Sequence, residues 1–355
     1  MEIRELVRED IRDLVPYEPQ LVTNVIKLDA NENPHPFPPV VMREIYARLV
    51  GDDFTRYPDP LGSKLKAKLA DSLQCRPDNI VLGNGSDELI QLLLQTFGGP
   101  GKRVIIPAPT FSMYRIHGEI TGTIPVEVPR DENFGLDMEL LLTEMKHPAT
   151  RVTFIATPNN PTGNCIPVSQ IRQLLSQVAS LVVVDEAYID FGGESCLPLL
   201  LEYNNLVLLR TFSKVGLAGL RVGYLAACRE VTVELAKVKQ PYNVNTVSQT
   251  AALAVLDHWA LFAEQISEIA AERERLADSL GKIPGVKVFP SQANFILFKV
   301  PVSTTELHRK LQEQGILLRK DPGSTHGLKT CLRVSVGTRQ ENDIFLEKLN
   351  TNLLP

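Results

Sequence analysis

The sequence contains few cysteines and histidines, and neither type is spaced as a metal site requires. The five cysteines are odd in number and never form a CxxC pair, which argues against a disulfide framework and against a zinc site. The six histidines show no HxxxH or HExxH spacing that would place two imidazoles on one helical face. We therefore expect reduced thiols in a cytoplasmic protein, and no metal ion.

Long apolar runs and blocks of one charge are also missing. Apolar runs such as 181–184 end at charges long before the roughly 18 residues that a membrane helix requires. The opening segment, MEIRELVREDIRDLV, lacks the apolar core of a secretory signal. The 37 basic and 42 acidic residues are interspersed and give a net charge of −5, which argues against nucleic acid as a partner. We expect no export and no attachment to a membrane or to nucleic acid.

The length of 355 residues and the hydrophobic share of 44% predict a folded chain of about two domains. Residues 1–40 include the proline-dense segment 31–39, which is typical of an ordered arm or a linker. Residues 41–280 alternate short apolar runs with helical patterns, which predicts a large α/β domain of parallel strands joined by crossover helices. Helices are expected at 87–97 and over the long stretch 247–280, and strands at 80–82, 104–106, 152–156, 181–184, 206–209 and 222–226.

Residues 281–355 show a different pattern, typical of a smaller α+β domain against which the N-terminal arm could fold. Capping boxes that begin at Ser303 and Thr338 predict the start of two helices. Strands are expected at 286–289, 295–300, 316–319 and 331–336.

Lys214 lies in the segment RTFSKVGLAGLR, directly after one of the expected strands. Its amine can form an imine with an aldehyde cofactor if the amine is partly desolvated or close to positive groups, and Arg221 could supply such a group. Taken alone, a lysine in this position is more often an ordinary surface residue.

The segment LVVVDEAY ends a buried-type strand with Asp185, where open α/β sheets place ligand contacts. Asp185 could hold the protonated pyridine nitrogen of such a cofactor, and Tyr188 could reach the phenolate oxygen of its ring. The alternatives are a solvated strand end or a magnesium site of a nucleotide enzyme, but the chain has no GxxxxGK[ST] loop to accompany the latter.

Two turn segments complete the set of motifs. GNGSDE, at 83–88, joins a strand to a helix, so that free backbone N–H groups and the helix dipole would favour an anion such as phosphate. It lacks the third glycine of a dinucleotide fingerprint, which makes a NAD site a poor fit. ATPNNPTG, at 156–163, is a turn by composition, and its asparagines could be simple turn formers.

In this order and spacing, GNGSDE, NNPTG, VVVDEAY and TFSKVGLAGLR resemble the fold-type I pyridoxal-phosphate aminotransferases. The segments LDANENPHPFP, RYPD, LLR and CLRVSVG look like the histidinol-phosphate aminotransferase family. The resemblance covers essentially the whole chain. It implies an α/β protein with a large, mainly parallel α/β/α sheet domain and a smaller α+β domain.

The resemblance also implies that the cofactor is pyridoxal 5'-phosphate, held as a Schiff base by Lys214. It places Asp185 at the ring nitrogen, Asn160 and Tyr188 at the ring oxygen, and Phe111 over the ring. Arg221 follows Lys214 after a spacing one residue shorter than in many relatives. The residues implied around the cofactor phosphate are Ser86, Asp87, Ser213 and Arg221, with Tyr57 reaching it from the other subunit of a homodimer.

For the substrate, the resemblance implies that Arg319 and Arg333 bind the anionic end through paired hydrogen bonds, with Tyr17 and Asn31 nearby. The implied reaction is transamination between L-histidinol phosphate and 2-oxoglutarate, giving imidazole-acetol phosphate and L-glutamate in histidine biosynthesis. A threonine-phosphate decarboxylase and an aromatic amino-acid aminotransferase are the alternatives.

Overall fold

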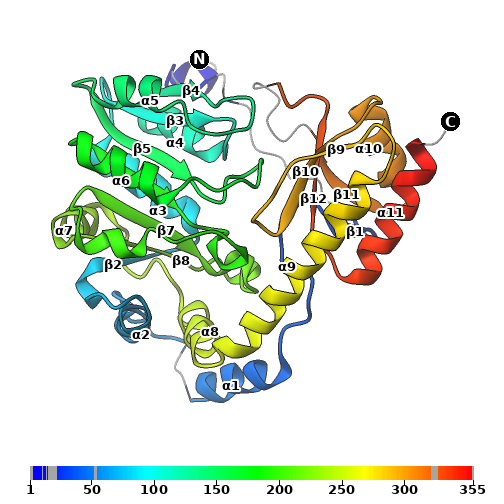
Figure 1. Cartoon of the computed structure of the whole chain (residues 1–355). Helices are drawn as coiled ribbons and strands as arrows, with labels where there is room; N and C mark the ends of the chain where they lie inside the picture. The colour runs from blue at the N-terminus through cyan, green and yellow to red at the C-terminus, as the bar shows by residue number, and fades with distance from the viewer. Residues whose placement is uncertain are drawn as a thin grey trace.

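The computed structural model describes residues 3–9, 11–12, 14, 22–51, 54–320 and 327–353. Two sheets organise these residues, one with the strand order β2-β8-β7-β6-β5-β3-β4 and one with the order β1-β11-β12-β10-β9. Figure 1 shows the larger sheet and its helices on the left, the smaller sheet on the right, and the long helix α9 (Trp259–Gly281) running between them.

The seven-stranded sheet is mainly parallel. The adjacent strands β4, β3, β5, β6 and β7 all run parallel to one another. Strand β8 runs antiparallel to both of its neighbours, β7 and β2. The strands are β2 (Ile80–Gly83), β3 (Arg103–Ala108), β4 (Ile124–Pro129), β5 (Thr150–Ala156), β6 (Leu181–Asp185), β7 (Leu206–Thr211) and β8 (Gly223–Ala227).

All six strands predicted for this region are confirmed, but two features differ from the prediction. The prediction missed β4, an edge strand that contains Pro125 and Pro129 and is largely exposed, so it has neither a continuous apolar run nor a clean alternation. The orientation of β8 was also wrong, because residues 212–222 form only 3₁₀ turns and cannot make the helical crossover that a parallel neighbour needs.

Helices cover both faces of the large sheet. Successive residues of β6 enter different cores: Val182 and Val184 pack with α2, α5, α6 and α8, and Val183 packs with α3, α4 and α7. The helices are α1 (Pro39–Leu49), α2 (Ser63–Leu73), α3 (Ser86–Phe97), α4 (Met113–Thr121), α5 (Met138–Met145), α6 (Val168–Gln177), α7 (Arg229–Val238) and α8 (Thr246–Asp257).

The single long helix expected over 247–280 is two helices. The chain leaves helical geometry at His258, with φ −111° and ψ 28°, and the His258 ring hydrogen-bonds to Glu44 of α1. Beyond this break, α9 packs Phe262 into the core of the large domain and Leu276 into the core of the small one. Because α9 belongs to both cores, the domain boundary after residue 280 stays a prediction, as does the arm over 1–40.

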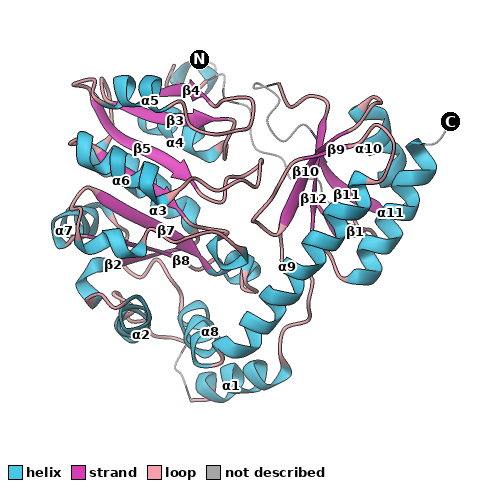
Figure 2. Cartoon of the chain, in the orientation of Figure 1, coloured by secondary structure: helices cyan, strands magenta, loops and turns pink. Residues whose placement is uncertain are grey.

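The small sheet contains a strand from the N-terminal arm, because β1 pairs in parallel with β11. Both predicted helix starts are confirmed, but only one capping box is complete: Thr338 and Glu341 bond to each other reciprocally, whereas at Ser303 the side chain accepts from the amide of Glu306 without a return bond from the Glu306 side chain. Figure 2 shows α10 and α11 beside this sheet. The elements are β1 (Ile26–Leu28), β9 (Lys287–Val288), β10 (Phe295–Lys299), β11 (Ile316–Lys320), β12 (Cys331–Ser335), α10 (Thr304–Glu313) and α11 (Arg339–Leu353). Among the described residues, no helix is both long enough and apolar enough to cross a membrane.

Candidate active site

The predicted motifs meet where the carboxyl ends of β5, β6 and β7 face the small domain. Lys214 ends a short 3₁₀ turn that directly follows β7, and its side chain is half-buried. Its Nζ donates to the carbonyl oxygen of Ala30 at 3.4 Å and lies 5.6 Å from the centre of the Tyr188 ring. Lys214 therefore lies between the large sheet and the N-terminal arm. A residue that bonds a ligand bound between them would need this position.

Asp185 is the last residue of β6, and its side chain is buried. One carboxylate oxygen accepts from the Tyr114 hydroxyl at 2.6 Å, and the other accepts from the Ala187 amide at 3.0 Å. Burial raises the pKa of Asp185 to about 6, although these two hydrogen bonds oppose the shift. Both partners are neutral, so a cation placed here, such as a protonated pyridine nitrogen, would favour the carboxylate.

Asn31 connects the arm to both domains. Its side-chain amide donates to the Tyr188 hydroxyl at 3.0 Å, and its Oδ1 accepts from the Ser335 hydroxyl at 3.0 Å. Its backbone amide donates to Ser335 Oγ at 2.8 Å, and its φ of 55° is in the left-handed region. The structure thus brings Asn31, predicted near the substrate, into a buried network with Tyr188.

The segment 83–88 leads into the N-terminus of α3, which begins with Ser86 and Asp87, and the N-terminus of a helix is suited to bind an anion. Arg221 donates to Asp87 Oδ2 at 2.9 Å and to Ser213 Oγ at 3.5 Å. Gly85 has φ +83°, and a Cβ added there would lie 2.6 Å from Arg221 Nη2. The four residues predicted around the phosphate are therefore in contact or adjacent, despite the shorter loop before Arg221.

Arg333 and Arg319 lie directly opposite each other on β12 and β11, so their side chains share one face of the small sheet. Arg333 donates to Asn160 Oδ1 at 2.5 Å and to the carbonyl oxygen of Asp29 at 2.6 Å. Its guanidinium carbon also lies 5.2 Å from the centre of the Phe295 ring. The predicted substrate residue Arg333 and the predicted cofactor residue Asn160 are thus in direct contact.

The remaining predicted residues differ in their placement. Phe111 packs edge-on against Tyr114, with ring centres 5.7 Å apart. The Tyr57 side chain is 80% exposed and stacks on Tyr242 at 4.5 Å, so its predicted role in a neighbouring site requires a second chain. Tyr17 lies outside the described residues.

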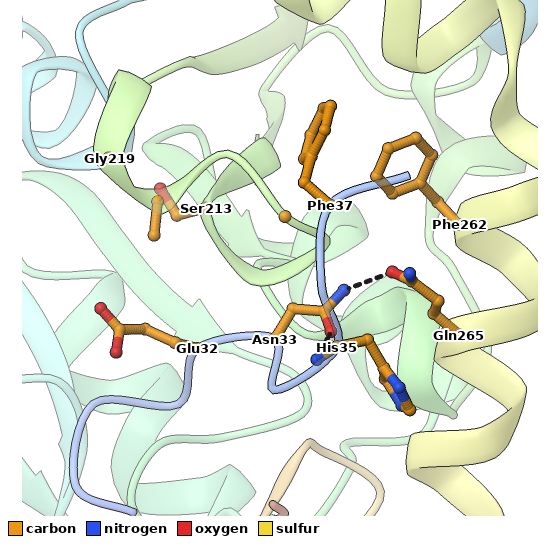
Figure 3. A pocket seen from close by; sticks show the side chains of 10 residues that line it. Glu32, Asn33, His35, Phe37, Ser213, Gly219, Phe262 and Gln265 are labelled. Atoms are coloured by element: carbon orange, nitrogen blue, oxygen red, sulfur yellow. Dashed lines mark hydrogen bonds between the residues drawn. The ribbon is translucent and has the colours of Figure 1, made fainter. Parts of the chain in front are cut away.

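A cavity of about 230 Å³ adjoins the site (Figure 3). The arm, the loop that follows Lys214 and α9 enclose it, and Asn33 joins all three by donating to Gln265 Oε1 at 3.0 Å and to the carbonyl oxygen of Val215 at 3.2 Å. Ser213 lines the cavity, but Lys214 and Asp185 do not. The cavity therefore lies beside the candidate active site, and Asn33 ties the arm to the loop that carries the lysine.

The sequence reasoning missed two residues of the site, Tyr114 and Ser335. Ser335 lies two residues after Arg333 on a strand, so alternation alone would have placed the two side chains on the same face. Tyr114 lies in the first turn of α4, and its amide donates to the carbonyl oxygen of Phe111, three residues earlier, in the turn that precedes the helix. Its partner, Asp185, belongs to a different element, and no local pattern indicates that pairing.

The model of the family "Aminotransferase class I and II" matches residues 23–349. This match, the mainly parallel sheet, the buried acid that ends β6 and the lysine that follows β7 define a pyridoxal-phosphate-dependent aminotransferase of that class. The chain is 46% identical to histidinol-phosphate aminotransferase 1 of Carboxydothermus hydrogenoformans over 96% of this chain and 97% of that protein. It is 41% identical to the histidinol-phosphate aminotransferase of Thermoanaerobacter sp. strain X514 over 99% of this chain and 100% of that one. The chain belongs to the histidinol-phosphate aminotransferase family, as its motifs predicted.

Solved structures agree with this assignment. The histidinol-phosphate aminotransferase of Sinorhizobium meliloti, determined in complex with pyridoxal-5'-phosphate, superimposes with a TM-score of 0.89 at 25% identity, covering 98% of this chain and 97% of that one. The residues of the present chain fit the same cofactor. Asp185 is a buried acid with only neutral hydrogen-bond partners, and the Gly85 turn is an anion cradle that a Cβ would fill.

Proposed function

We propose that this enzyme transfers an amino group between L-histidinol phosphate and 2-oxoglutarate, giving imidazole-acetol phosphate and L-glutamate, as a step of histidine biosynthesis. Names of relatives at 41% and 46% identity support the substrate. The structural observation that carries it is the pair Arg319 and Arg333 on adjacent strands, with Arg333 bonded to Asn160. Two guanidinium groups on one face suit a phosphomonoester in one half-reaction and a carboxylate in the other.

Pyridoxal phosphate supplies an electron-withdrawing ring that stores the amino group between the two halves of the reaction. Asp185 would hold the ring nitrogen, and Asn160 and Tyr188 the ring oxygen. Lys214 would hold the cofactor through its aldehyde, and the free Lys214 amine would move a proton at the substrate carbon. Phe111 would cover the ring, and the cradle of Ser86, Asp87, Ser213 and Arg221 would bind the phosphate.

The test is product formation with a defined set of donors. Purified enzyme with L-histidinol phosphate and 2-oxoglutarate should yield glutamate, and L-phenylalanine should be a far poorer donor. Carbon dioxide released from threonine phosphate without any acceptor would instead identify a decarboxylase. Faster turnover of phenylalanine would identify an aromatic aminotransferase.

Arg333→Lys tests the role of the guanidinium pair, because it keeps the charge and loses the forked hydrogen bonds. We expect KM for histidinol phosphate to rise about tenfold or more, since the forked contacts contribute roughly 1.5–3 kcal/mol. Arg172→Lys is the matched control, because Arg172 forms a surface ion pair with Glu202. An unchanged KM in Arg333→Lys would refute the assignment of Arg333 to the substrate.

We further propose a cytoplasmic homodimer in which Tyr57 reaches the phosphate site of the neighbouring subunit. The exposed Tyr57 and Tyr242 stack, and Phe54 and Leu61 are exposed on the same segment, which supports a covering partner chain. The five free thiols agree with a reducing compartment.

Mixing two crippled variants tests this arrangement of the dimer. Tyr57→Ala and Lys214→Ala chains, refolded or exchanged together, would form hybrids in which one site has both native residues. When equal amounts of the two chains pair at random, half of the dimers are hybrids, and each hybrid has one intact site of two. We therefore expect activity to return to about one quarter of the native value. Activity that stays at the sum of the two parent variants would show that Tyr57 does not act across subunits.

A further inference from the structure

Tyr114 contacts the candidate active site but has no role in the reaction proposed above. It lies in the first turn of α4, is fully buried, and donates its hydroxyl hydrogen to Asp185 Oδ2 at 2.6 Å. This is a short hydrogen bond to a carboxylate that has no cationic partner among the described residues. The other bond to that carboxylate comes from the backbone of Ala187. Tyr114 therefore supplies the only side-chain hydrogen bond that the structure shows for Asp185.

The Tyr114 ring is held on two sides. It stacks on Phe154 of β5 with ring centres 4.6 Å apart and planes 3° from parallel. Its second neighbour is Phe111, which it meets edge-to-face at 5.7 Å and 86°. Such aromatic pairs add stability beyond the area that they bury. The hydroxyl is thus fixed by the ring packing, and the same ring buttresses the residue assigned to cover the cofactor.

The hydroxyl also remains a donor. Burial, reinforced by the neighbouring Asp185 carboxylate, raises the pKa of Tyr114 well above its ordinary value, so the hydroxyl keeps its proton. Burial of Asp185 favours its neutral acid, whereas a bond accepted from Tyr114 favours the carboxylate. Tyr114 therefore opposes the effect of burial on the group assigned to the ring nitrogen.

We propose that Tyr114 is a positioning residue for pyridoxal phosphate: its hydroxyl orients Asp185 and keeps it charged for the ring nitrogen, while its ring sets the plane of Phe111. The inference rests on the proposed cofactor contacts of these two residues. It predicts that Tyr114 acts on the ring nitrogen in particular and not on the phosphate or the aldehyde.

The test compares two ligands of the cofactor-free protein. One is pyridoxal phosphate, and the other is its analogue with carbon in place of the ring nitrogen. Each is titrated by fluorescence at pH 8 to obtain a dissociation constant. The native protein should prefer the natural cofactor. Tyr114→Phe keeps both ring contacts and loses only the hydroxyl, and we expect this preference to fall by about tenfold, the usual effect of losing a hydrogen bond to a charged group.

Two further variants separate this role from packing. In the Asp185→Asn background, Tyr114→Phe should leave the ligand preference unchanged, which closes a double-mutant cycle. Tyr203→Phe is the control for loss of a hydroxyl, because Tyr203 precedes β7 and so lies at the opposite edge of the sheet from Asp185. If Tyr114→Phe does not fold, a ring-fluorinated tyrosine at position 114, which is a stronger donor of the same shape, should raise the preference.

The outcomes distinguish the inference from the proposed function. A native protein that does not bind pyridoxal phosphate would overturn the cofactor contacts and this inference together. If the native protein binds pyridoxal phosphate and prefers it to the carbon analogue, but neither variant at position 114 changes this preference, the inference alone is overturned. A fall in affinity for both ligands by the same factor would assign Tyr114 a purely structural role and would also overturn the inference.

Discussion

Asp185→Asn is expected to make the cofactor-free protein more stable, although it removes the acid that we propose to hold the cofactor ring nitrogen. Burial raises the pKa of Asp185 from its ordinary value of 3.8 to about 6. A carboxyl whose pKa is raised in the folded state costs stability above that pKa and costs nothing below its ordinary value. Asparagine is neutral at every pH. Its oxygen can still accept from the Ala187 amide, and its NH2 can donate to the Tyr114 oxygen, which replaces the native bond by one of opposite direction.

The magnitude follows from the pKa difference. At about 1.4 kcal/mol for each pKa unit, the shift from 3.8 to about 6 corresponds to a cost of about 3 kcal/mol at pH 8. At pH 5 the folded carboxyl is mostly protonated, and the cost falls to roughly half of that value. The free energy of unfolding of the variant should therefore exceed that of the native protein by about 3 kcal/mol at pH 8 and by about 1.5 kcal/mol at pH 5.

Urea unfolding of the two cofactor-free proteins at pH 5 and pH 8, followed by circular dichroism, measures this gap. The comparison uses equal protein concentrations, because association would otherwise contribute to the midpoint. A gap that is the same at both pH values, or a variant that is less stable at pH 8, would contradict the account of a buried and uncompensated carboxylate. We also expect added pyridoxal phosphate to stabilise the native protein but not the variant.

Three other substitutions test separate parts of the site. Ser335→Ala removes both hydrogen bonds to the arm and should lower the free energy of unfolding by about 1–2 kcal/mol, measured by urea titration. Glu186→Gln leaves the Arg210 guanidinium without its buried carboxylate, and we expect a loss of about 3–5 kcal/mol, seen as a lower melting temperature. Gly85→Ala places a Cβ 2.6 Å from Arg221 Nη2 at a φ of +83°, so affinity for inorganic phosphate and for pyridoxal phosphate should both fall, as dialysis would show. An alanine variant with native phosphate affinity would refute the cradle.

Much of the fold could be predicted because its signals are local. Buried parallel strands such as β6 are continuous apolar runs, and the cap at Ser303 and the capping box at Thr338 use residues only three positions apart. The motif residues also come together for a general reason. Asp185 ends β6 and Lys214 follows β7 by three residues, and the carboxyl ends of these two parallel strands lie at the same edge of the sheet.

What the sequence did not predict depends on contacts between distant segments. The edge strand β4 has little burial to give it a pattern, and the break at His258 depends on Glu44 of α1. Tyr114 is a partner of Asp185 only because α4 packs on the large sheet, with the Tyr114 ring stacked on Phe154 of β5, next to β6. Asn31 lies 304 residues from Ser335, so their reciprocal hydrogen bonds leave no trace in any sequence window.

The most direct test of the central claim is the absorbance spectrum of the purified protein, recorded before and after addition of L-histidinol phosphate and then of 2-oxoglutarate. We expect a band near the visible edge that is absent in Lys214→Ala, that histidinol phosphate bleaches and that 2-oxoglutarate restores as glutamate appears. A band that persists after histidinol phosphate is added would contradict the proposed substrate, and a band that survives in Lys214→Ala would contradict the role of the lysine itself.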